Sequence, residues 1–109
     1  MIIFDKNKIN TLIPLWNYKI KENCYNYIER KIIFPSFSQA WKFMNEISEH
    51  NEKINHHCKY INDYNKVKIK IYTHTLKDIT EKDIKLANII DDTLKNYDHE
   101  IKKEKTINK

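Results

Sequence analysis

Residues 67–73, VKIKIYT, constrain the fold more than any other segment of this sequence. Val67, Ile69, Ile71 and Thr73 alternate with polar or charged residues. In an extended strand, the first set therefore shares one face and the second set the other. The segment predicts a strand of an antiparallel sheet, with one face against a core and the opposite face toward water.

The rest of the sequence predicts an α+β domain with the order α-β-β-α-β-β-α. The expected elements are a short helix within 1–15, strands near 16–20 and 25–34, a helix from 36, strands at 60–64 and 67–73, and a helix from about 81 to 97. Strands joined by short turns pair as hairpins. We therefore expect a single four-stranded antiparallel sheet with the helices packed on one face.

Two helix starts have the spacing of a capping box, Ser36 with Gln39 and Thr80 with Asp83. This spacing favours Asp83 as the partner of a helix cap over a catalytic acid. In each helix, apolar residues at helical spacing predict a stripe that faces the core. The stripes are Phe37, Ala40, Trp41, Met44 and Ile47 in one helix, and Ile84, Ala87, Ile90 and Leu94 in the other. The tail at 100–109 is expected to be frayed.

Composition limits the class of protein. With 109 residues the chain forms one domain, 1–109, and Cys24 and Cys58 are too few for a disulfide framework. The N-terminal apolar run is too short for a signal peptide and no stretch approaches membrane-spanning length, so a cytoplasmic protein without membrane contact is expected. The net charge is +5, but lysines are interleaved with acidic residues and Arg30 is the one arginine. This pattern favours a solvated surface over direct binding to nucleic acid.

Two adjacent histidines, His56 and His57, precede the strand at 60–64, and His74 ends the polar side of the strand at 67–73. If these strands form a hairpin, counting outward from its turn at Asn65-Lys66 places His56 or His57 beside His74. Clustered imidazoles suit proton transfer, because an unperturbed histidine titrates near neutral pH. Glu52, four residues before His56, is placed to orient one ring.

Two other interpretations of the histidines remain open at this point. Each histidine taken alone is more simply a surface residue. A metal site made of His56, His57, Cys58 and His74 has suitable ligand types, but adjacent ligands do not easily face one ion. We therefore expect no metal.

The segment EKINHHCKYINDYNKVKIKIYTHTLKDITEKDIKLANII resembles the pterin-4a-carbinolamine dehydratase family, also known as dimerization cofactors of a homeodomain transcription factor. The matching positions are Glu52, His56, His57, Tyr60, Tyr64, Asn65, Thr73, His74 and Asp83. The resemblance is clearest over 16–92. Departures include Cys58 in place of a proline, Tyr60 in place of a tryptophan, Asp63 in place of an apolar residue, and a missing glycine near Asp78.

The resemblance implies dehydration of a 4a-hydroxytetrahydropterin by histidine acid/base catalysis, without a cofactor. It implies that His56 and His74 act as acid and base and that His57 orients the pterin. Glu52, Cys58, Tyr60, Thr73, Thr75 and Leu76 are the expected substrate-binding or supporting residues. The expected partners are a small pterin and further copies of the chain, as a homodimer or homotetramer, with a protein partner also possible. The alternative is a non-catalytic dimerization cofactor or protein-binding module with the same fold.

Overall fold

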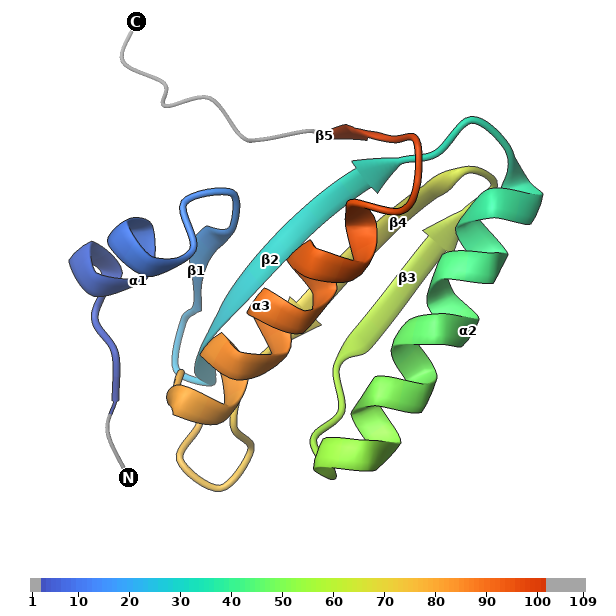
Figure 1. Cartoon of the computed structure of the whole chain (residues 1–109). Coiled ribbons are helices and arrows are strands. Elements are labelled where there is room, and N and C mark those ends of the chain that lie inside the picture. The colour runs from blue at the N-terminus through green and yellow to red at the C-terminus, as the bar shows by residue number, and fades with distance from the viewer. Residues whose placement is uncertain (1–2, 102–109) are drawn as a thin grey trace, which may run out of the picture.

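The computed structural model describes residues 3–101, apart from the side chain of Ile101 (Figure 1). The elements are α1 (Lys6–Leu12), β1 (Asn17–Lys21), β2 (Tyr25–Ile33), α2 (Phe37–Ile54), β3 (Lys59–Asp63), β4 (Lys66–Ile71), α3 (Glu81–Leu94) and β5 (Glu100–Ile101). The first seven elements have the expected order α-β-β-α-β-β-α. The last helix ends at Leu94, three residues before the expected end.

The sheet is antiparallel, with the strand order β1-β2-β4-β3. The predicted four-stranded sheet is thus confirmed. The short β5 adds a fifth strand, because Ile101 pairs with Ile32 and Glu100 with Ile33 at the end of β2. The expectation of a frayed tail was therefore wrong for residues 100–101, where backbone pairing holds the chain. Residues 102–109 lie outside the described part.

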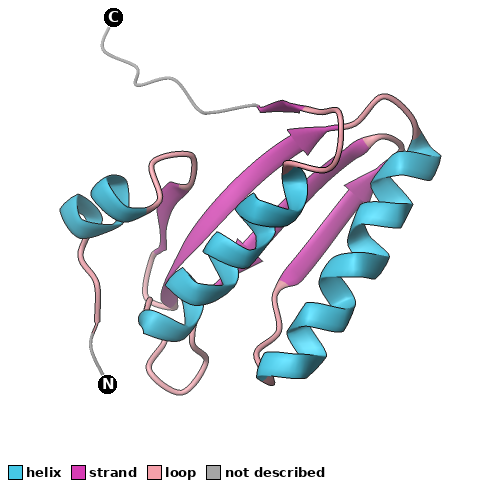
Figure 2. Ribbon diagram, in the orientation of Figure 1, coloured by secondary structure: helices cyan, strands magenta, loops and turns pink. Residues whose placement is uncertain are grey.

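Helices α2 and α3 lie side by side over one face of the sheet, and α1 lies beside β1 (Figure 2). The covered face carries the apolar side chains predicted for β4. Val67, Ile69 and Ile71 are at most 1% exposed. The other face of the sheet, which the helices leave open, can be read from the strand register, because residues directly opposite each other in paired strands share a face. The lysines on the open face are Lys19, Lys21, Lys31, Lys59, Lys66, Lys68 and Lys70.

Helix α2 buries a different stripe from the one predicted. Phe43 is fully buried, whereas Phe37 and Trp41 are 47% and 54% exposed. The prediction that Phe37 and Trp41 face the core was therefore wrong. Ala40, Met44 and Ile47 are shared by both stripes, and docking on the sheet selects the side with Phe43. Phe37 and Trp41 instead stack on each other at the surface.

A buried ion pair ties the sheet to α3. Arg30 of β2 bonds to the carboxylate of Asp91, which also accepts a hydrogen bond of 2.9 Å from the indole N–H of Trp16. Burial opposes both charges, raising the pKa of Asp91 and lowering that of Arg30, while their mutual attraction acts in the opposite direction. Loss of one partner would leave the other charge buried and unpaired.

The chain contains no glycine, so other residues take the left-handed backbone positions at its turns. These residues are Asn23, Asn55, Tyr64 and Lys77. Asparagine tolerates this conformation better than most residues. Tyr64 and Asn65 form the turn between β3 and β4, one residue earlier than expected. Lys77, with φ of 54°, lies next to Asp78, in the region where the resemblance predicted a glycine.

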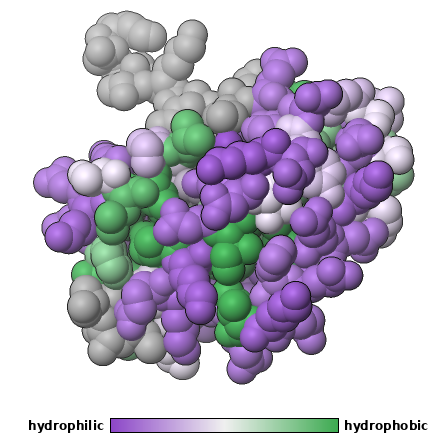
Figure 3. Space-filling model, viewed as in Figure 1, coloured by the Kyte–Doolittle hydropathy of each residue, from purple (hydrophilic) through white to green (hydrophobic). Residues whose placement is uncertain are grey.

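The surface seen from the helical side is mostly hydrophilic, with hydrophobic patches between the hydrophilic residues (Figure 3). Within residues 3–101, no helix is both long enough and apolar enough to cross a membrane.

Candidate active site

A pocket of about 350 Å³ lies where the end of α2, the loop after β4 and the start of α3 meet. It is lined by Asn55, His56, His57, Thr73, His74, Thr75 and Lys82. The three histidines singled out in the sequence therefore line one pocket, although they come from two segments of the chain. The β3–β4 hairpin brings the two segments together.

The end of α2 presents the first two histidines. Asn55 adopts a left-handed conformation with φ of 53° and ends the helix. The backbone N–H of His56 donates to the carbonyl of Asn51 at 3.1 Å, which closes the last turn. The left-handed residue redirects the chain, so that His56 and His57 leave the helix at the pocket.

His56 is held by a buried carboxylate. Its Nε2 lies 2.6 Å from Oδ1 of Asp83, and the side chains of His56 and Asp83 are 12% and 0% exposed. A carboxylate accepts hydrogen bonds, so Nε2 carries the proton in this contact. In the neutral ring, Nδ1 is then left as the basic nitrogen. Asp83 therefore orients the ring of His56, whereas Glu52, the residue predicted to orient one ring, contacts His57.

Asp83 is fixed in turn by the capping box of α3. Its Oδ2 accepts from the backbone N–H of Thr80 at 2.8 Å and from the hydroxyl of Thr73 at 2.7 Å. Thr80 is the N-cap, as the sequence predicted. Because the Thr73 proton is used on Asp83, the hydroxyl of Thr80 donates to Thr73 across 2.7 Å. The same carboxylate therefore caps a helix and orients a histidine.

His57 has a different partner. Its Nε2 lies 2.7 Å from Oε2 of Glu52, and the two side chains are 59% and 76% exposed. Exposed pairs of this kind contribute about 0–1 kcal/mol to stability, because water screens them. Glu52 therefore supports His57 at the rim of the pocket and leaves it free to adjust to a ligand.

His74 contacts an aromatic ring rather than a carboxylate. Its imidazole stacks on the ring of Tyr72, with centroids 4.4 Å apart and planes 23° apart. Tyr72 alternates with the buried Ile71 and Thr73, so its ring, and with it the stacked His74, lies on the side of the sheet opposite the helices. Among the described residues, no hydrogen bond to the ring of His74 is found, so both of its nitrogens are available to a ligand or to water.

The other predicted site residues separate into two groups. Thr73 and Thr75 line the histidine pocket, whereas Cys58, Tyr60 and Leu76 are not among its lining residues. Cys58 and Tyr60 pack against the core, where the side-chain amide of the buried Asn51 donates to the phenol oxygen of Tyr60 at 2.7 Å. Their role in substrate binding stays a prediction.

This second group contains a protected thiol. Burial raises the pKa of Cys58, while hydrogen bonds with Tyr60 and Asn51 act in the opposite direction. Burial also raises the pKa of Tyr60, and the neighbouring Cys58 adds to the shift. Both groups therefore remain neutral around pH 7, and they anchor β3 to the end of α2.

Sequence reasoning missed two residues that line the pocket, Asn55 and Lys82, and underestimated Asp83. Asn55 could have been found as the asparagine that ends a helix in a chain without glycine. Lys82 lies in the first turn of α3, and no feature of the sequence marks it as a pocket residue. Within residues 3–101, no three His, Cys, Asp or Glu side chains are grouped so that they could hold a metal ion.

The fold and the pocket define a small α+β protein whose candidate site offers three imidazoles for binding and proton transfer. The sequence profile of the family described as pterin 4 alpha carbinolamine dehydratase matches residues 4–93. The chain therefore belongs to this family, and the resemblance noted in the sequence is confirmed.

Individual relatives agree with this assignment. A protein of Prochlorococcus marinus, provisionally named pterin-4-alpha-carbinolamine dehydratase, is 38% identical over 92 residues, which cover 82% of this chain and 92% of the relative. A protein of Burkholderia pseudomallei with the same provisional name is 38% identical over 65 residues, covering 60% of this chain and 64% of the relative.

Two solved structures share the fold. A transcriptional coactivator/pterin dehydratase from Brucella melitensis superposes with a TM-score of 0.71 at 27% identity, covering 84% of this chain and 98% of the other. A pterin dehydratase-like protein identified as a RuBisCO assembly factor in the alpha-carboxysome has a TM-score of 0.61 at 19% identity, covering 72% and 87% of the two chains. The second likeness shows the fold alone.

Proposed function

We propose that this protein dehydrates 4a-hydroxytetrahydropterins to quinonoid dihydropterins, in the recycling of tetrahydrobiopterin or a related pterin. The observation that carries the proposal is the pocket in which His56, His57 and His74 meet. Asp83 gives His56 a defined tautomer within that pocket. A protein that served only as a scaffold would have no use for this arrangement.

The reaction removes water from a carbinolamine. A base takes the proton from N5 of the ring, the C4a–O bond breaks, and an acid protonates the departing hydroxyl as water. The electrons of the N5–H bond form the new N5–C4a double bond, so no redox partner is required. General acid–base help of this kind contributes about 10²–10⁴-fold to a rate.

In our proposal, His56 and His74 exchange the protons and His57 binds the pterin. Nδ1 of His56 is the basic nitrogen left by the bond to Asp83. His74 is held by stacking and keeps both of its nitrogens available, so it can serve as the second proton carrier. The exposed His57, paired with Glu52, is suited to holding the substrate.

The direct test is dehydration of a synthetic carbinolamine by the purified protein, compared with the uncatalysed rate. We expect His56→Ala and His74→Ala each to lower kcat by about 10–100-fold, and the double variant to do much worse, because no second imidazole remains. His57→Ala should raise KM more than it lowers kcat. Wild-type dehydration rates in the double variant would refute the proposal.

We further propose that the protein forms homodimers or homotetramers. Strand β3 is an open edge of the sheet, and such edges invite pairing with another chain. On α2, the exposed rings of Phe37 and Trp41 offer a second contact surface, which Phe37 extends by stacking on Tyr64. Light scattering should report a mass above the 13.3 kDa of one chain at micromolar concentration. A purely monomeric protein would exclude both contacts.

The alternative function is that of a dimerization cofactor or protein-binding module without catalysis. The same exposed aromatic surface of α2 would then contact another protein. This alternative and the enzymatic proposal are separated by the histidine variants. A binding module keeps its full function in the His56→Ala, His74→Ala double variant, whereas the dehydratase loses it.

A further inference from the structure

A row of aromatic rings runs across the open face of the sheet and ends in the candidate active site. Tyr25 of β2 stacks on Tyr72, with centroids 4.0 Å apart and planes 10° apart. Tyr72 stacks in turn on His74, which lines the histidine pocket. Tyr27 packs against Tyr25 at 5.6 Å. His74 therefore belongs both to the pocket and to a surface outside it.

Lysines flank this aromatic row. Nζ of Lys21 lies 5.5 Å from the ring centre of Tyr25, and Nζ of Lys70 lies 5.0 Å from that of Tyr27. Lys59 of β3 is the direct cross-strand neighbour of Lys70. Lys21 is the cross-strand neighbour of Tyr25, so this cation lies beside the aromatic row that leads to His74.

The charges on this surface repel each other. Like charges directly opposite on paired strands are destabilising. The pKa of Lys70 is lowered, first by partial burial and then by the neighbouring Lys68, Lys59 and Lys21, while Glu29 acts in the opposite direction. Glu29 is only 3% exposed and is one carboxylate among several lysines on this face. An anion placed on this surface would relieve the repulsion.

We propose that the surface formed by Tyr25, Tyr72, Lys21, Lys59 and Lys70 binds the side chain of the pterin substrate, and that this side chain is aromatic and carries carboxylates. This inference rests on the proposed function, because it takes the pterin ring to occupy the histidine pocket. The aromatic row would contact the flat part of the side chain, and the ammonium groups would pair with its carboxylates. A glutamyl-extended pterin has this chemistry, whereas a short neutral side chain would leave the surface unused.

The first test measures binding without reaction. The dissociation constants of 7,8-dihydrobiopterin, with its neutral side chain, and of 7,8-dihydrofolate triglutamate are compared by fluorescence titration. Two or three exposed ion pairs predict about 10-fold tighter binding of the glutamyl compound at low ionic strength. The preference should shrink strongly at about 0.5 M salt, where screening is short-ranged. Equal affinities at low salt would overturn the proposal.

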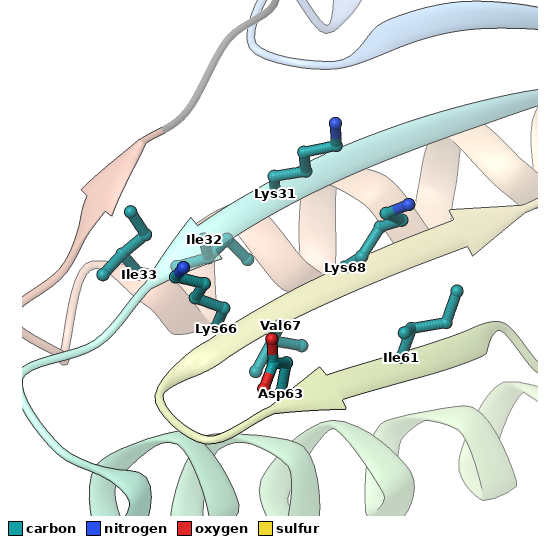
Figure 4. Close-up of a pocket in the computed structure, with 8 residues that line it drawn as sticks. All are labelled: Lys31, Ile32, Ile33, Ile61, Asp63, Lys66, Val67 and Lys68. Carbon is teal, nitrogen blue, oxygen red and sulfur yellow. The ribbon is translucent and has the colours of Figure 1, made fainter.

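A pair of double variants localises the effect. Lys21→Gln with Lys70→Gln should remove most of the preference for the glutamyl compound and leave the affinity for dihydrobiopterin unchanged. The matched control is Lys31→Gln with Lys66→Gln, which removes the same charge from the same face and changes no lysine that acts on Lys70. Lys31 and Lys66 line a hollow of about 360 Å³ toward the opposite end of the sheet (Figure 4). An equal loss of preference in both double variants would indicate a general charge effect and refute a local site.

Kinetics separate this inference from the proposed function. The carbinolamines prepared from tetrahydrobiopterin and from glutamyl-extended tetrahydrofolate are both offered to the enzyme. We expect a higher kcat/KM for the glutamyl substrate, mainly through a lower KM, because contacts far from the reacting atoms hold the substrate and transition state alike. Equal kcat/KM values would refute the proposed site for the substrate side chain but would still support the proposed dehydratase activity. Failure to dehydrate either compound would refute the function, and with it the inference.

Discussion

Replacement of Asp83 by asparagine tests whether a helix cap also serves the chemistry. The carboxylate is fully buried and accepts from three donors, at Nε2 of His56, the hydroxyl of Thr73 and the N–H of Thr80. An amide has one oxygen and one NH₂ group. Whichever way it is turned, its NH₂ group faces at least one group that donates to the carboxylate in the wild-type protein.

The two orientations of the amide have different costs. With its oxygen toward Thr73 and Thr80, the amide NH₂ faces His56, which must then turn Nε2 into an acceptor and carry its proton on Nδ1. The basic nitrogen proposed for catalysis is thereby lost. With the oxygen toward His56, the cap of α3 is broken instead. A hydrogen bond to a charged group contributes about 1.5–3 kcal/mol, so Asp83→Asn should lower the free energy of unfolding by about 2–3 kcal/mol.

We expect kcat to fall by about 10–100-fold in Asp83→Asn, because the base at His56 is lost or misoriented. Urea denaturation measures the stability, and initial rates are taken well below the melting temperature. Long-range ¹H–¹⁵N spectra of the imidazole report which nitrogen of His56 carries the proton. The control is Thr80→Ala, which removes the N-cap hydroxyl at a cost of about 0.5–2 kcal/mol and leaves the contact between Asp83 and His56 in place. If Asp83→Asn loses stability but keeps the wild-type kcat, Asp83 is only a helix cap and our argument is wrong.

Three further outcomes are expected. Asp91→Ala should lower the free energy of unfolding, measured by urea denaturation, by about 3–5 kcal/mol, because Arg30 is left buried without its partner. The control Asp92→Ala, at an exposed position of α3, should change this free energy by less than about 0.5 kcal/mol. Because burial raises the pKa of Cys58, little of this thiol is ionised at pH 8, and iodoacetamide should modify the exposed Cys24 first. The reaction at Cys58 should accelerate as the pH rises above about 9. Equal rates for the two cysteines at pH 8 would contradict the burial of Cys58. Dehydration should survive treatment with a chelator, and loss of activity that zinc restores would replace the proton-transfer scheme by a metal site.

The sequence by itself determined the four main strands, their pairing in two hairpins and the meeting of the histidines. These features depend on local rules, namely alternation in β4, a short turn between β3 and β4, and caps at Ser36 and Thr80. A slip of one residue in the pairing would turn Val67, Ile69 and Ile71 away from the helices, so burial of one face specifies the register strongly. Because His56, His57 and His74 lie at fixed distances from the turn, their convergence follows from counting residues.

Tertiary packing decided what counting could not. Two apolar stripes overlap on α2, and only the contact with the sheet selects Phe43 over Phe37 and Trp41. The bond between His56 and Asp83 joins residues 27 positions apart, and it exists because the start of α3 docks beside the end of α2. The lysines look evenly mixed with acidic residues along the chain, yet folding gathers many of them on one face, because each strand turns alternate side chains away from the core. Local periodicity determines which residues can share a face of a helix or strand. Only the packing of the helices on the sheet determines whether that face contacts the core, a neighbouring element or water.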